Sequence, residues 1–183
     1  DVAVDGYTCA TALQHVANGV DVIGASGAQL SVCDMLFGFM PGSIGETSVV
    51  AIALGALLLL WTGVASWKTM LSVFVGGIVM LFVFADRLPE AMPFWQHLLL
   101  GGFCFGAVFM ATDPVTSART EVGKYIYGFG IGAMTILIRV LNPGYPEGMM
   151  LAILLMNVVA PFIDYCVVQS NVNARAKRLT KKN

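Results

Sequence analysis

Long apolar runs recur along this chain, and they constrain its fold more than any other feature. A helix needs about 20 predominantly apolar residues to cross a hydrocarbon core of about 30 Å. Of the 183 residues, 57% are hydrophobic and 11% charged, whereas about 25% are charged in an ordinary soluble domain. The sequence therefore predicts an all-α integral membrane protein rather than a soluble one.

The apolar runs predict five transmembrane helices, which together form a bundle over residues 48–168. We read residues 1–29 as an extramembrane loop and residues 30–47 as a short re-entrant or interfacial segment, because Pro41 and Gly42 end an apolar run too short to span. Residues 169–183 form a basic tail. The predicted spans cover residues 48–66, 69–85, 97–112, 124–141 and 148–168.

An odd number of spans places the two ends of the chain on opposite sides of the membrane. Five of the ten Lys and Arg residues lie in the tail, so the positive-inside rule predicts a cytoplasmic tail and an N-terminal loop outside. The same topology puts Lys68, Arg119 and Lys124 inside. The chain begins at Asp1 without a methionine, and we expect it to be a piece of a longer protein.

Several classes of site are disfavoured by the residue pattern. No nucleic-acid surface is visible. The four cysteines show no C-x-x-C pair and are interpreted as small buried apolar residues, with disulfides as the less favoured alternative. His15 and His97 have no partner at metal-ligand spacing, and both are predicted to be structural.

Asp164 and Asn157 lie seven residues apart in the last predicted span, which puts them on one face of a helix. A carboxylate at membrane depth is costly unless it is paired or hydrated, so a place in an ion path is one hypothesis. The alternative is that Asp164 reaches interfacial water near the inner end of its span. Asp113 ends the third span, where it is either a helix-end cap or a cation contact.

Two further charged residues are open to a structural explanation. Arg139 stands near the outer end of the fourth span and is predicted to snorkel to the surface. Glu46 precedes the first span, where capping by neighbouring Ser and Thr accounts for the sequence, although a ligand site is possible. Small residues at helical spacing, such as the pairs Ser72/Gly76 and Gly128/Gly132, predict a closely packed helical bundle.

Five segments carry a resemblance to a known family over nearly the whole chain. Residues 5–11 (DGYTCAT) resemble a flavinylation motif, Asp-x-x-Ser/Thr-Gly-Ala-Thr, with Cys9 in place of the glycine. Residues 41–48 (PGSIGETS), 109–115 (FMATDPV) and 145–150 (YPEGMM) resemble runs of the NqrB subunits of Na⁺-translocating NADH:quinone reductases and of the related RnfD subunits of Rnf complexes. The run at 164–168 (DYCVV) with its basic tail looks more like the former.

The resemblance implies a function that the residue pattern alone does not. Thr11 would carry covalent FMN through a phosphoester, with Asp5, Thr8 and Ala10 recognised by a flavin transferase on the outer side. Asp113 and Asp164 match positions implicated in sodium handling. Family members have ten spans in two inverted five-helix halves, of which this chain would be the second, and the quinone-linked residues belong to the first.

We therefore expect an electron-carrying subunit of a Na⁺-pumping NADH:ubiquinone oxidoreductase in the bacterial inner membrane. Its partners would be the other subunits, with riboflavin as a further candidate cofactor elsewhere in the complex. Three alternatives stay open: a subunit of an Rnf-type ferredoxin:NAD oxidoreductase, a non-redox channel or secondary transporter, and a bare helical scaffold. Covalent flavin separates the redox hypotheses from the others.

Overall fold

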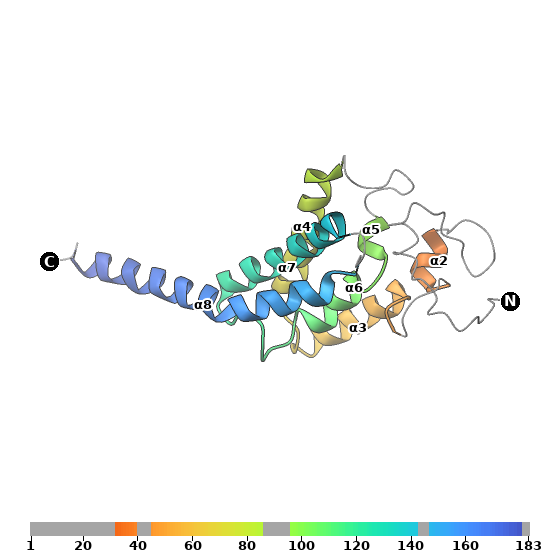
Figure 1. The fold of residues 1–183 in the computed structure, drawn as a ribbon. Helices are drawn as coiled ribbons and strands as arrows, with labels where there is room; N and C mark the ends of the chain where they lie inside the picture. The colour runs from red at the N-terminus through yellow and green to blue at the C-terminus, as the bar shows by residue number, and fades with distance from the viewer. Residues whose placement is uncertain (1–31, 40–44, 86–95, 143–146, 181–183) are drawn as a thin grey trace.

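The computed structural model describes residues 32–39, 45–85, 96–142 and 147–180, whose regular elements are all helices, with no strand among them (Figure 1). Thr11, Asp5, Thr8 and Ala10 lie outside the described residues. The elements in chain order are α2 (Val32–Phe37), α3 (Val49–Trp61), α4 (Trp67–Val83), α5 (Gln96–Leu99), α6 (Phe103–Phe105), the π-helix η2 (Gly106–Met110), α7 (Glu121–Leu141) and α8 (Met149–Thr180).

Two of these helices are long and apolar enough to cross a membrane, namely Glu121–Leu141 and Met149–Arg178. Helices α3 and α4 are apolar but shorter, and at about 1.5 Å per residue they reach about 20 Å and 25 Å. The structure therefore supports an all-α membrane protein. The count of five spans and the ten-helix inverted repeat stay predictions.

The centre of the bundle is the pair α4 and α7, against which α8 packs from the other side of α7. Side chains from all three helices form the main buried cluster, including Val73, Tyr127, Ile131 and Met156. The start of α4 lies beside the start of α7, since Ser72 donates a hydrogen bond to the carbonyl of Tyr125. Helix α8 runs antiparallel to α7.

The predicted small-residue contact between helices is confirmed for α4 and α7. A Cβ added at Gly132 would overlap the carbonyl oxygen of Val73, and one added at Gly128 would lie 2.7 Å from the carbonyl oxygen of Thr69. Such close approach lets backbones pack without intervening side chains, which drives helix association in a membrane.

The third predicted span, residues 97–112, is not one continuous helix, and this expectation was wrong. Helix α5 ends at Leu99, Gly101 adopts a left-handed conformation with φ of 66°, and the chain resumes as α6 and then as the π-helix η2. Glycine adopts positive φ without steric cost, so the Gly101-Gly102 pair permits the break.

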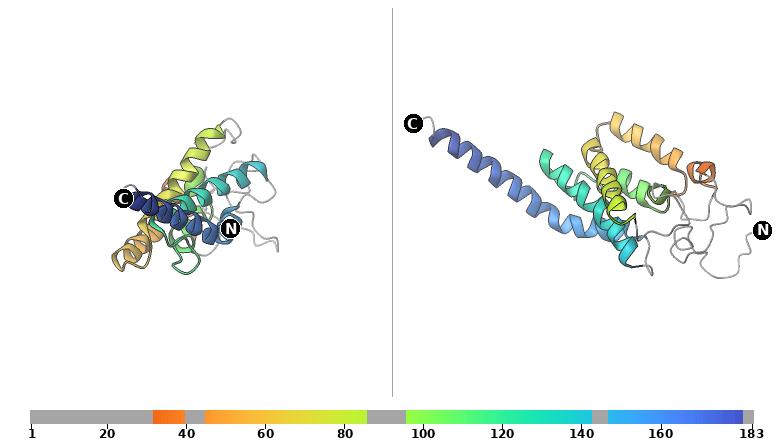
Figure 2. Two further views of the ribbon diagram at one scale, coloured as in Figure 1. Left: turned by 90° about the vertical axis from the view of Figure 1, so that its left-hand side faces the viewer. Right: turned by 90° about the horizontal axis from the view of Figure 1, so that it is seen from above.

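Helix α8 continues through the predicted end of the last span at residue 168 and reaches Thr180. Figure 1 and the right-hand view of Figure 2 show its C-terminal half extending beyond the other helices. Pro161 lies inside the helix without ending it.

Candidate functional site

Asp164 on α8 joins the start of α7 and the loop before it. One carboxylate oxygen accepts the backbone N–H of Arg119 at 2.8 Å. The other accepts both the backbone N–H of Thr120, at 3.0 Å, and its hydroxyl, at 2.6 Å. Thr120 is the N-cap of α7, and its own hydroxyl oxygen accepts the N–H of Gly123 at 3.1 Å. Asp164 therefore holds the capping residue of a neighbouring helix in place.

Asp113 holds the other end of the same loop through contacts within its own turn. Its carboxylate accepts the N–H of Val115 at 3.2 Å and both the N–H and the hydroxyl of Thr116, at 3.2 Å and 2.7 Å. The Thr116 hydroxyl and the Val115 N–H keep the pKa of Asp113 below its ordinary value. These bonds all go to residues that follow Asp113, so they cap the next turn rather than the end of the third predicted span.

The two carboxylates therefore bracket residues 113–120 but bind different donors. A carboxylate offers about four lone-pair positions, and each of these groups uses three. One position on each remains for a further donor or a cation. Among the described residues, no group of three or more His, Cys, Asp and Glu side chains could hold a metal ion.

Asn157 and Asp164 do share one face of α8, as predicted, because both contact α7. The hydroxyl of Tyr127, in the second turn of α7, donates a hydrogen bond to the side-chain oxygen of Asn157 on α8. Sequence reasoning missed Tyr127, whose position inside an apolar span was the available signal. Tyr127 has a fully buried side chain, so the bond provides a polar link in the helix contact.

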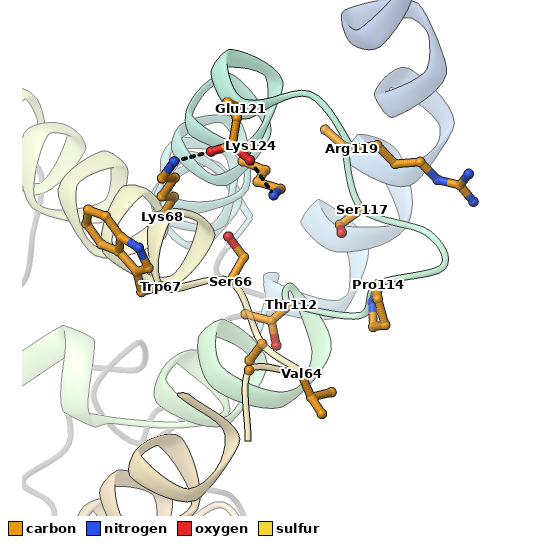
Figure 3. Close-up of a pocket in the computed structure, with 13 residues that line it drawn as sticks. Val64, Ser66, Trp67, Lys68, Thr112, Pro114, Ser117, Arg119, Glu121 and Lys124 are labelled. Carbon is orange, nitrogen blue, oxygen red and sulfur yellow. Dashed lines mark hydrogen bonds and ion pairs between the residues drawn. The ribbon is translucent and has the colours of Figure 1, made fainter. Parts of the chain in front are cut away.

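An open cavity of about 450 Å³ lies at the same end of the bundle, between the α3–α4 turn and residues 112–124 (Figure 3). The Lys68 ammonium pairs with one oxygen of Glu121, and Lys124 pairs with the other at 2.9 Å. Arg119 also lines the cavity, although Figure 3 shows its guanidinium pointing away from the lysines. Two segments predicted to lie inside, the α3–α4 turn and the loop before α7, thus meet at one end. That this end faces the cytoplasm stays a prediction.

Arg139 lies at the opposite end of the bundle. The prediction that its side chain snorkels to the surface was wrong. Its guanidinium donates to the carbonyl of His97 and, at 3.2 Å, to the carbonyl of Leu100, and it lies 5.7 Å from the centre of the Phe103 ring. These carbonyls lie in the last turn of α5 and directly after it, where the helix break removes their usual partners. The free carbonyls at the break in the third predicted span therefore hold the arginine side chain inside the bundle.

Buried polar atoms without a partner gather near Arg139. His97 Nε2, Arg139 Nε and Glu147 Oε1 have no hydrogen-bond partner in the part of the chain that the structure describes. His97 is buried, in agreement with its structural interpretation. Glu46 lies close to Gly102, directly before α6. Ser48 caps α3 by accepting the N–H of Ala51 at 3.3 Å.

The cysteine interpretation is confirmed at one position and wrong at two. Cys104 is buried, whereas Cys33 and Cys166 are exposed, and all three are free thiols. The exposed pair lies on α2 and on the outward face of α8, where none of the described helices covers them.

Comparison with known proteins gives a consistent result. Residues 2–173 match the sequence model of the NQR2, RnfD, RnfE family. The chain is 51% identical over 183 residues to the B-type subunit (NqrB) of the Na(+)-translocating NADH-quinone reductase of Chromohalobacter salexigens, covering 97% of this chain and 44% of that protein. The proteins of the same name from Azotobacter vinelandii and Klebsiella pneumoniae are 49% and 47% identical to this chain. In both cases the match covers 96% of this chain and 45% of the relative. The chain thus spans less than half the length of these relatives.

Proposed function

This chain belongs to the NQR2, RnfD, RnfE family, and we propose that it is an electron-transferring membrane subunit of a Na⁺-translocating NADH:quinone reductase. The observation that carries the proposal is the 47–51% identity, over nearly all of this chain, to proteins named as the NqrB component of that enzyme. The subunit acts within a complex and is not catalytic alone. We further propose that quinone binds the part of the whole protein that this chain does not cover.

We assign Thr11 as the attachment point of covalent FMN, with Asp5, Thr8 and Ala10 as the residues that a flavin transferase recognises. The support is the order and spacing of these residues in the flavinylation motif. When bound, FMN supplies the redox chemistry of its isoalloxazine ring. The chain supplies the acceptor hydroxyl, on a loop that the charge distribution predicts to lie outside the bacterial inner membrane.

Asp164 and Asp113 are proposed to contact Na⁺. In support, each carboxylate keeps one unused lone-pair position, and both anchor a loop beside an open cavity at one end of the bundle. A carboxylate held by fixed donors is preorganised, so binding a cation requires little rearrangement of the loop. Replacing Asp164 by Asn in the whole complex should raise the Na⁺ concentration needed for half-maximal turnover.

The flavin assignment is tested by gel fluorescence. The full-length protein, produced with its flavin transferase and denatured, should show a fluorescent flavin band that Thr11→Ala removes. Thr62→Ala is the matched control, because this exposed threonine at the end of α3 lies outside the motif. A fluorescent Thr11→Ala band refutes the site.

The same experiment separates the competing functions. A wild-type protein that never carries flavin favours a non-redox channel or secondary transporter, in which the carboxylates bind substrate without a redox role. The matched family also includes RnfD and RnfE, and the names of the three relatives favour the quinone reductase.

A further inference from the structure

The lining of the cavity around Glu121 carries an excess of positive charge. Lys68 on α4 and Lys124 on α7 converge on the single carboxylate of Glu121, so two ammonium groups share one negative charge (Figure 3). Glu121 is the more exposed member, with 63% of its side chain accessible, against 28% for Lys68 and 24% for Lys124. An incoming anion can therefore replace Glu121 without moving either lysine far.

Hydroxyl groups complete a set of donors around the same space. Ser66 from the α3–α4 turn and Ser117 from the loop before α7 both line the cavity. Ser66 occupies the N-cap position of α4, but its side chain makes no capping hydrogen bond, so the first amides of this 17-residue helix lack their usual side-chain acceptor. An anion held by the lysines would also meet the positive end of the α4 dipole.

The surroundings of the cavity are those of a membrane–water boundary. Trp67 lines the cavity and is 54% exposed, and Trp61, at the end of α3, is 89% exposed. Exposed tryptophans are enriched at the headgroup level of membrane proteins. Leading away from the cavity, Leu57, Leu58 and Leu60 of α3 present an exposed apolar surface of the kind that an acyl chain contacts.

We propose that this cavity binds the phosphate headgroup of an anionic phospholipid between Lys68 and Lys124. The basic groups and the hydroxyls recognise the phosphate, and the apolar surface of α3 holds the acyl chains. A basic pocket between transmembrane helices is a known way to recognise such headgroups. The proposal goes beyond the electron-transfer function and requires neither covalent flavin nor a particular orientation of the bundle.

The test is native mass spectrometry of the purified, delipidated complex, titrated separately with phosphatidylglycerol, phosphatidylcholine and inorganic phosphate. We expect a tight phosphatidylglycerol site that Lys68→Gln weakens about five-fold and the Lys68→Gln/Lys124→Gln pair about 25-fold. Lys177→Gln/Arg178→Gln is the matched control, because it removes two exposed charges from the tail of α8 and should leave the tight site intact.

Glu121→Gln tests the same site if the lysine variants fail to assemble. It removes the carboxylate that competes for the lysines, so phosphatidylglycerol should bind about five-fold more tightly, which misfolding would not produce. Unchanged affinity in this variant and in an assembled lysine pair overturns the proposal. Equal binding of phosphatidylcholine also overturns it, as does displacement of phosphatidylglycerol by inorganic phosphate at the concentration of the lipid. A lysine variant that loses a protein subunit while its lipid count is unchanged overturns it too, because the lysines then hold a subunit and not a lipid.

Discussion

Replacing Asp164 by Ala should loosen the start of α7 while leaving its middle unchanged. The change removes three hydrogen bonds, with donor–acceptor distances of 2.8, 3.0 and 2.6 Å, from Arg119 and Thr120. Bonds to charged groups contribute about 1.5–3 kcal/mol each, but water replaces some of this at a partly exposed site, so we take about 1 kcal/mol each. A total of about 3 kcal/mol corresponds to about a hundred-fold increase in local opening.

Hydrogen exchange of the full-length protein in lipid nanodiscs measures this opening. The amides of Arg119, Thr120 and Gly123 should exchange about a hundred-fold faster in Asp164→Ala, whereas those in the middle of α7 keep their protection. Asp113→Ala is the control, since it should release the first turn of the loop only. Unchanged exchange at Arg119 and Thr120 would refute the anchoring role of Asp164.

Three further predictions concern contacts inside the bundle. Gly132→Ala should lower stability by about 3 kcal/mol or more because its Cβ overlaps the α4 backbone, whereas Gly130→Ala, which meets a flexible methionine end, should cost below about 1.5 kcal/mol in thermal unfolding. Arg139→Lys should raise maleimide labelling of buried Cys104 about ten-fold, with the other cysteines replaced by serine, because a lysine cannot bind the carbonyls of His97 and Leu100 together. Equal labelling counts against this role of Arg139. Tyr127→Phe should cost about 1 kcal/mol by removing the hydroxyl donor to α8, and an unchanged melting temperature argues against that bond.

Hydropathy predicted the regular helices well, because their length and apolar content are local properties. The predicted spans at 69–85 and 124–141 correspond to Trp67–Val83 and Glu121–Leu141. The end of α8 was missed because hydropathy falls at Gln169, whereas the residues that follow contain neither glycine nor proline. A helix ends where its backbone can no longer continue, and loss of hydrophobicity alone does not stop it.

The candidate site could be predicted only in part. The seven-residue spacing of Asn157 and Asp164 correctly placed them on one face, since helical periodicity is visible in a single segment. Their partners were not predictable in this way. Thr120 and Tyr127 lie 44 and 30 residues away in the chain, and only the antiparallel arrangement of α7 and α8 brings them into contact.

Arg139 and the interrupted third span are best understood together. A charged side chain in a transmembrane helix is costly, and so is a helix end that leaves carbonyls without donors at membrane depth. Considered separately, Arg139 was predicted to snorkel to the surface and residues 97–112 were predicted to form one continuous span, and both predictions were wrong. In the structure, the guanidinium supplies donors to the carbonyls of His97 and Leu100, so each cost offsets the other. Neither residue pattern reveals this compensation, because it depends on where α7 ends relative to the break at Gly101.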